Sequence, residues 1–153
     1  MTRVARPARP EDSAEMLRLM IGLAEFEKNI DDFAVTEEAL LERGFGEKAQ
    51  FRALVIDAAD RPGLAGIAVL YEIPFTYTLK PNLVLKELFI DPRDRGRGLG
   101  SVLFTAATQI ARTGGYGELI WTVMNGNEPA ERFYRGMGGE PDVKWNNWVY
   151  RLR

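Results

Sequence analysis

A glycine-rich stretch between a predicted strand and a predicted helix constrains this chain more than any other feature. It reads Arg-Gly-Arg-Gly-Leu-Gly-Ser over residues 95–101. Residues 83–90 before it are mostly apolar, as in a buried strand, and Asp91-Pro92 ends that run. After it, apolar residues recur at helical spacing on one face: Leu99, Val102, Leu103, Ala106 and Ile110. The glycines therefore lie where the chain leaves a sheet and begins a helix.

Such a junction is suited to binding an anion. A glycine backbone adopts dihedral angles closed to other residues and can approach a ligand closely. The first amides of a helix have no internal acceptor, and the helix dipole adds partial positive charge there. We therefore predict a phosphate or pyrophosphate site, with Arg95 and Arg97 as cationic donors at its rim. A solvated Arg- and Gly-rich turn without a ligand is the alternative that the loop alone leaves open.

The spacing Gly-x-Gly-x-Gly separates this loop from two common phosphate-binding motifs. A dinucleotide fingerprint requires Gly-x-Gly-x-x-Gly, and Ser101 stands at the last required position. A P-loop ends in Gly-Lys-Ser or Gly-Lys-Thr, and neither tripeptide occurs in the sequence. Both motifs are therefore disfavoured.

The composition predicts one globular domain spanning residues 1–153. Apolar residues make up 46% and charged residues 27%, and the formal net charge of −2 gives no electrostatic reason to expect a nucleic-acid partner. No run of 18 apolar residues occurs, and the first residues do not resemble a signal peptide. We therefore expect a cytoplasmic protein without a membrane partner.

Two residue types are missing, and both absences restrict the chemistry. The sequence contains no cysteine, which excludes disulfides, thiolate metal sites and a cysteine nucleophile. It also contains no histidine, the commonest metal ligand and general base. We expect no metal site and no covalent enzyme intermediate, so direct transfer between two bound substrates is favoured.

Periodicity and turn residues predict the order β-α-α-β-β-β-α-β-α-β. The first helix begins near Ser13, runs to about Asn29 and buries a stripe of Leu17, Met20, Ile21 and Ala24. Thr36 and Gly44 bound a short second helix. The remaining predicted elements are strands at 3–6, 51–56, 64–71, 83–90, 119–124 and 145–152, and helices ending near 113 and 138. This order predicts an α/β fold in three layers, with a mixed sheet covered by helices on both faces.

The glycine loop and the order of elements resemble the GNAT superfamily of N-acetyltransferases. Arg95, Gly98 and Gly100 fill the fixed positions of that family's Arg/Gln-x-x-Gly-x-Gly/Ala loop. Further segments resemble the diamine N-acetyltransferases, which include the spermidine/spermine and thialysine enzymes: residues 17–20, 23–28, 44–46 and 127–130, with Phe133-Tyr134. The resemblance covers nearly the whole chain except the tail. It implies a mostly antiparallel sheet whose fourth and fifth strands splay apart.

The resemblance also implies a cofactor and an acceptor. Acetyl-CoA would donate its acetyl group to a primary amine of a diamine, a polyamine or a lysine-like molecule, in a protein that is a homodimer. Its pyrophosphate would bind the loop amides, its pantetheine arm would pair with β-strand backbone, and Asn127 and Tyr134 would contact it. The residues so implicated are Leu88, Phe89, Ile90, Arg95, Gly96, Arg97, Gly98, Leu99, Gly100, Ser101, Asn127 and Tyr134.

Two residues are candidates for proton transfer. Tyr134 occupies the position of the family's general acid, two helical turns after Asn127, although a core aromatic residue is the alternative from periodicity alone. Related enzymes have Glu-Asp where this chain has Lys86-Glu87, so a lysine replaces the glutamate assigned there as base. Strand alternation sends Glu87 to the opposite face from that position. Either a bulge re-aims Glu87, or another carboxylate and a water chain act instead, with Glu87 paired to Lys86 on a solvated strand.

Acceptor recognition would depend on the end of the first helix. Glu27 matches an acidic residue at the substrate end of the resembling enzymes, whereas Phe26 stands where polyamine acetyltransferases have a tyrosine. Neighbouring acidic residues would attract a cationic amine. An ordinary solvated helix end explains these charges equally well. The sequence also leaves open other functions: acetylation of a protein N-terminus or an amino-sugar, and a non-catalytic acyl-CoA sensor.

Overall fold

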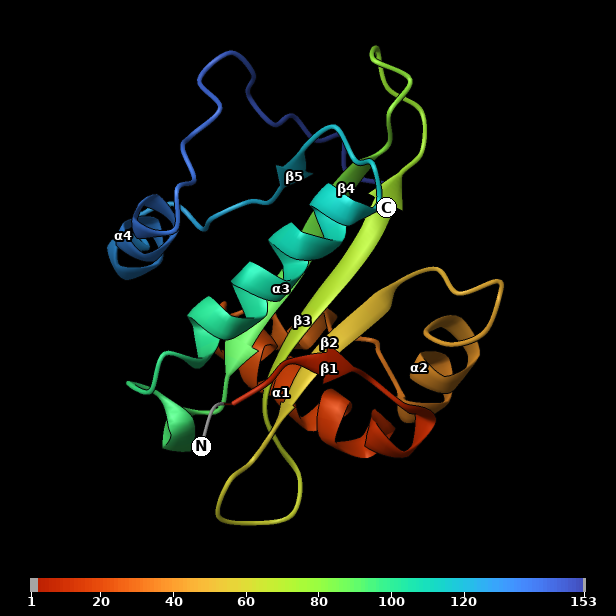
Figure 1. Ribbon diagram of the computed structural model, residues 1–153, viewed down its shortest axis with the longest axis vertical. Coiled ribbons are helices and arrows are strands. Elements are labelled where there is room, and N and C mark those ends of the chain that lie inside the picture. The colour runs from red at the N-terminus through yellow and green to blue at the C-terminus, as the bar shows by residue number, and fades with distance from the viewer. Residues whose placement is uncertain (1–2, 153) are drawn as a thin grey trace. The chain divides into compact units, whose positions relative to one another are not determined.

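The computed structural model describes residues 3–152, which divide into two units, residues 3–122 and residues 123–152. In the first unit, strands and helices follow one another as in Figure 1. Their bounds are β1 Arg6–Pro7, α1 Ser13–Phe26, α2 Glu37–Arg43, β2 Arg52–Asp57, β3 Leu64–Ile73, β4 Asn82–Ile90, α3 Leu99–Thr113 and β5 Leu119–Ile120. Short 3-10 turns occupy Pro10–Asp12, Ile30–Asp32 and Pro92–Asp94.

The strands form one sheet in the order β1-β2-β3-β4-β5. The first four pair antiparallel, and β4 pairs parallel with β5. That last pairing joins Leu83 to Leu119 and Val84 to Ile120 and then ends. The predicted mixed, mostly antiparallel sheet with a splayed fourth and fifth strand is confirmed.

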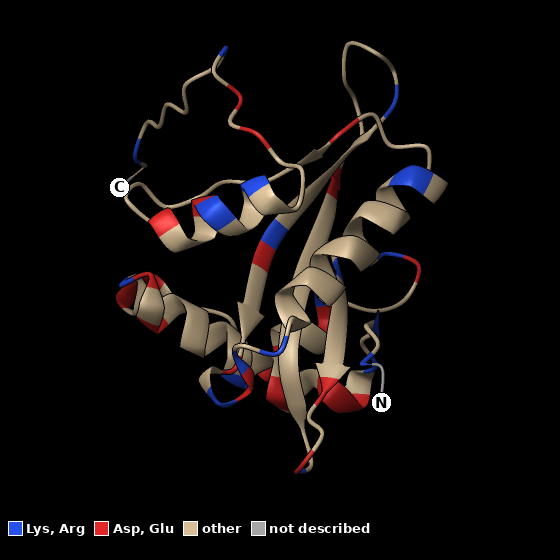
Figure 2. Ribbon diagram, turned by 60° about the vertical axis from the view of Figure 1, so that its left-hand side comes forward, with Lys and Arg blue, Asp and Glu red and all other residues tan. Residues whose placement is uncertain are grey.

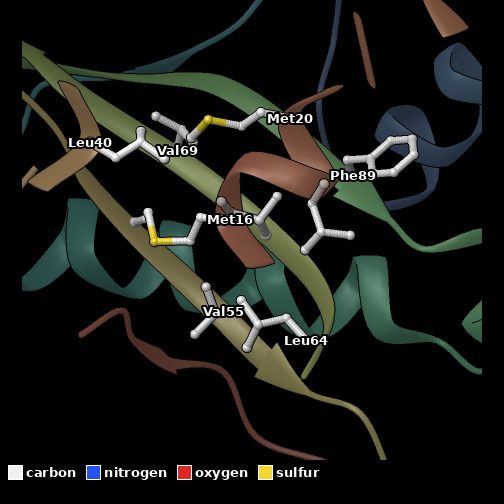
Figure 3. Packing of buried hydrophobic residues seen from close by; sticks show 10 residues of the cluster. Met16, Met20, Leu40, Val55, Leu64, Val69 and Phe89 are labelled. Atoms are coloured by element: carbon white, nitrogen blue, oxygen red, sulfur yellow. The ribbon is translucent and has the colours of Figure 1, made fainter. Parts of the chain in front are cut away.

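Helices cover both faces of this sheet. On one face, Met16 of α1 and Leu40 of α2 share an apolar cluster with Val69 of β3 (Figure 3). On the other face, a Cβ added at Gly66 of β3 would lie 3.2 Å from Leu103 of α3. Because residues 66 and 69 are an odd number apart in one strand, they face opposite sides. The three-layer arrangement predicted from the sequence is therefore confirmed.

Local chemistry explains where α1 ends. The predicted helix extends to Asn29, but α1 stops at Phe26. Lys28 adopts the left-handed conformation with φ +60°, and the amide of Asn29 donates back to the carbonyl of Ala24 at 3.0 Å. This turn satisfies carbonyls at the end of the helix and redirects the chain. The predicted buried stripe is correct at Met20 and Ala24, whereas Leu17 and Ile21 are only partly buried.

Two strands of the first unit also differ from their predicted bounds. The first strand lies at Arg6–Pro7 rather than residues 3–6, on the sheet edge, where a proline is tolerated. The strand predicted over residues 119–124 is confined to Leu119–Ile120, the two residues that pair with β4.

The second unit contains α4, Glu128–Gly136. Asn127 caps it, its side-chain oxygen accepting a hydrogen bond from the amide of Ala130 at 3.3 Å. The strand predicted over residues 145–152 is wrong: the structure assigns no strand to these residues. Aromatic and branched side chains favour a strand there, but the propensity of a segment does not determine whether another strand lies beside it to pair with. Among residues 3–152, no helix is long and apolar enough to cross a membrane.

Candidate active site

The glycine loop has the backbone geometry of an anion site. Gly96 and Gly98 both adopt left-handed conformations, with φ of +78° and +76°. Gly98 is the N-cap of α3 and offers no side-chain oxygen to the helix. The first backbone hydrogen bond of α3 runs from the amide of Val102 to the carbonyl of Gly98 at 3.2 Å. The amides of Leu99, Gly100 and Ser101 therefore have no intrahelical acceptor, and the helix dipole directs partial positive charge to them.

The two loop arginines are placed differently from each other. The Nε of Arg95 donates to the carbonyl of Ile90 at 3.1 Å, and its guanidinium lies 5.3 Å from the centre of the Phe89 ring. Arg95 therefore fixes the end of β4 as well as contributing charge. The guanidinium of Arg97 is half exposed and lies 3.8 Å from Asp94. Both arginines remain exposed beside the loop, as predicted.

The strand before the loop has an open edge. Beyond the Val84–Ile120 pair, the structure pairs β4 with no described strand on its β5 side. That edge includes the backbone of Leu88, Phe89 and Ile90, which the sequence assigned to cofactor contact. An unpaired strand edge presents amide and carbonyl groups that an extended, amide-containing ligand can complement.

A β-bulge in β4 decides where Glu87 points. Val69 pairs with Glu87 and Leu70 pairs with Leu85, so Lys86 is an extra residue in β4. Directly opposed residues share a face, and Val69 belongs to the cluster that packs against α1. A bulge at Lys86 therefore turns Glu87 toward the α1 face.

The neighbourhood of Glu87 favours its protonated form. Burial raises the pKa of the Glu87 carboxyl, and the charge of Glu27 raises it further. Lys86 acts in the opposite direction on the same pKa. One carboxylate oxygen, Oε2, is buried without a hydrogen-bond partner among the described residues. A carboxyl with a raised pKa and an unsatisfied oxygen is a better proton acceptor than an ordinary surface carboxylate.

The end of α1 contributes the acidic neighbour. Glu27 is the C-cap of α1 and is partly buried, whereas Phe26 is 53% exposed. A Cβ placed at Gly22 would lie 2.9 Å from the Phe89 ring, so α1 packs closely against this part of β4. The fold thus brings Glu27 near Glu87, two residues that the sequence assigned to different roles.

Two further candidate residues belong to the second unit. Asn127 caps α4, and Tyr134 lies in its last turns, where its ring packs edge-to-face on Phe133 with centres 5.1 Å apart. The Asn-Glu-Pro start predicted for this helix is confirmed, with Pro129 in the first turn.

Sequence reasoning missed the acidic residues beneath the loop. Asp91 and Asp94 are almost fully buried, and four arginines bind them. Arginine hydrogen bonds hold the pKa of each carboxyl below its usual range. The only local signal was Asp91-Pro92, since Asp91 caps the 3-10 turn that follows it. Two of the four arginine partners, Arg18 and Arg61, come from distant parts of the sequence.

Comparison with known proteins identifies the family of this chain. Residues 16–138 match the Acetyltransferase (GNAT) family. The thialysine N-epsilon-acetyltransferase of Mus musculus is 30% identical over 97% of this chain and 89% of its own length. The spermidine/spermine N(1)-acetyltransferase-like protein 1 of Homo sapiens is 28% identical over 87% of this chain and 20% of its own length.

The fold has close structural counterparts. An aminoglycoside acetyltransferase from an uncultured soil metagenomic sample, solved with sisomicin, superposes with a TM-score of 0.80 at 18% identity. That alignment covers 99% of this chain and 97% of the other. The chain therefore belongs to the GNAT family of acetyltransferases, in the diamine and thialysine branch that its motifs resemble.

Proposed function

We propose that this protein transfers the acetyl group of acetyl-CoA directly to a primary amine of a small cationic acceptor. The acceptor is a diamine, a polyamine or a lysine-like molecule. The observation that carries the proposal is the pair of left-handed glycines that opens the N-terminus of α3. GNAT acetyltransferases use acetyl-CoA, and the free amides of residues 99–101 suit its pyrophosphate.

The open edge of β4 is assigned to the pantetheine arm. Its amides would pair with the backbone of residues 88–90 as an added strand would. This places the thioester along β4, on the strand that carries Glu87. Asn127 and Tyr134 are assigned to further cofactor contacts by the family resemblance alone.

Glu87 is the proposed general base. An ammonium group must lose a proton before it can attack a thioester, and a carboxyl with a raised pKa accepts that proton directly or through water. The neutral amine then attacks the carbonyl carbon, its nitrogen loses a second proton to solvent, and the carbon–sulfur bond breaks as the thiolate leaves. Tyr134 is the proposed acid that protonates this thiolate. The proton that Glu87 accepted then passes through solvent to Tyr134 and restores its phenol.

The acceptor side is assigned to the end of α1. Glu27 supplies negative charge beside Glu87, and exposed Phe26 supplies an apolar surface for a methylene chain. The thialysine N-epsilon-acetyltransferases, by their name, acetylate the ε-amine of a lysine-like molecule. Charge attraction and apolar contact together favour an alkyl amine over a neutral acceptor.

The test is thiol release from acetyl-CoA with a panel of amines. The chain has no cysteine, so a thiol reagent detects free CoA without a background from the protein. The matched pair lysine and cadaverine differs only by a carboxylate; spermidine, an amino-sugar and a peptide N-terminus complete the panel. Turnover with the alkyl amines supports the proposal. Turnover confined to the amino-sugar or the peptide would overturn the acceptor assignment, and tight CoA binding without any turnover would indicate a sensor.

A further inference from the structure

An ion-pair network ties the start of the glycine loop to two distant segments of the first unit. Its centre is formed by Asp91 and Asp94, which are 3% and 1% exposed. In Figure 2, ribbon segments of basic (blue) and acidic (red) residues lie close together at this end of the sheet. Neither carboxylate belongs to the catalytic groups proposed above.

Arg61, in the turn between β2 and β3, makes the closest of these contacts. Its Nη2 lies 2.5 Å from Oδ2 of Asp94, and its Nη1 lies 3.3 Å from Oδ1. The same guanidinium reaches Asp91 at 3.4 Å. On the loop side, Asp94 also lies 3.8 Å from Arg97, the residue between the two left-handed glycines. Arg61 is thus connected through one carboxylate to the middle of the loop.

A second arm of the network comes from α1. Nη1 of Arg18 donates to Asp91 at 2.7 Å, and its Nη2 donates to the carbonyl of Leu64 at 3.0 Å. Glu15 holds Arg18 in place and also accepts from the amide of Leu64. The first residue of β3 and the residue that follows β4 are therefore fixed to the same helix.

The network has an electrostatic consequence for an anionic ligand. A buried carboxylate that loses its cationic partner is left uncompensated. Without Arg61, Asp94 would keep only the more distant Arg97, at 3.8 Å, and its negative charge would repel an anion bound at the adjacent loop. Arg61 therefore neutralises Asp94 as well as holding it.

We propose that Arg61 is a positioning residue for the cofactor loop: through Asp94 it sets the loop shape that binds acetyl-CoA, without touching the ligand itself. This inference rests on the proposed function of the loop. Arg61 lies in the turn between β2 and β3, outside the strand that carries Glu87. The inference therefore predicts that its loss changes cofactor affinity and leaves the catalytic step largely unchanged.

The test compares variants by calorimetric titration with CoA and by steady-state kinetics with acetyl-CoA. In Arg61→Met and in Asp94→Asn, we expect the Kd for CoA and the KM for acetyl-CoA to rise about tenfold, with kcat within about threefold, since small displacements of binding groups can cost up to about a hundredfold. Because the two residues form one interaction, the double variant should bind CoA no more weakly than the weaker single variant.

Arg6→Met is the matched control. Arg6 likewise binds two carboxylates, Asp12 and Asp57, but at the β1 edge of the sheet. Its loss should lower thermal stability and leave the Kd for CoA unchanged. An unchanged Kd in Arg61→Met, or in Arg61→Lys if the first variant does not fold, would overturn the inference. Failure of the wild-type protein to bind CoA would instead overturn the proposed function.

Discussion

Replacing Gly98 by alanine tests the glycine loop with the smallest possible change. Gly98 has φ +76°, and a Cβ added there would meet no other atom within 4 Å. The substitution therefore introduces no clash within the protein, and its cost is backbone strain. A left-handed conformation costs a residue with a Cβ about 1–2 kcal/mol. If the loop relaxes to relieve that strain, its amides turn away from the ligand and affinity falls by roughly 5- to 30-fold.

Gly115 provides a control at the opposite end of the same helix. It has φ +74° and equally open surroundings, so Gly115→Ala carries the same backbone strain without altering the loop. We expect both variants to lose similar thermal stability, measured by circular dichroism. Only Gly98→Ala should raise the KM for acetyl-CoA and the Kd for CoA. If Gly98→Ala loses stability like Gly115→Ala and keeps a KM within twofold of wild type, the assignment of these amides to the pyrophosphate is refuted.

Three further predictions concern the proton-transfer groups. Glu87→Gln should lower kcat by about 10²- to 10⁴-fold, the usual contribution of a general base. The same variant should raise the melting temperature at pH 7 but not at pH 4. Burial raises the folded-state pKa of Glu87, so the protonated carboxyl stabilises the fold below the ordinary carboxyl pKa. That stabilisation is lost as the pH rises through the raised pKa, and glutamine does not lose it. An unchanged kcat would remove Glu87 from the mechanism. Lys86→Gln removes a charge that lowers the pKa of Glu87, so it should move the acidic limb of the kcat/KM profile to higher pH. Glu27→Gln removes a charge that raises the same pKa, so it should move that limb to lower pH. A shift of both variants in one direction contradicts the assignment of Glu87 as the base. Tyr134→Phe should lower kcat strongly and leave the Kd for CoA nearly unchanged, and equal activity would exclude it as the acid.

Local sequence patterns were sufficient for the loop because its determinants are local. Apolar spacing changes from strand to helix on either side of residues 95–101, and glycine at 96 and 98 permits the positive φ values that the structure shows. The helix caps were predicted correctly for the same reason. The side chain of Thr36 accepts a hydrogen bond from the amide of Ala39, and that of Asn127 accepts one from the amide of Ala130. Such contacts span three residues, so a sequence read alone contains both partners.

Features set by distant partners were not predictable in this way. Arg61 and Asp94 are 33 residues apart, and Arg18 and Asp91 are 73 apart, so no window of sequence contains either pair. The predicted length of the fifth strand was wrong for a similar reason. Residues 119–124 have the composition of a strand, but only two of them pair with residues of β4. Strand propensity describes what a segment tolerates, while the extent of pairing depends on the neighbouring strand.

The bulge in β4 connects this limit to function. In a regular strand, residues 85 and 87 would point to the same face. Glu87 would then lie in the apolar layer that contains Leu85. The extra residue at Lys86 breaks that alternation: Leu85 pairs with Leu70 on the α3 side, and Glu87 pairs with Val69 on the α1 side. The pairing of β4 with β5 ends just before this point, at Val84. One irregularity therefore coincides with two requirements of the proposed reaction, an unpaired strand edge for the pantetheine arm and a partly buried carboxylate on the face toward α1.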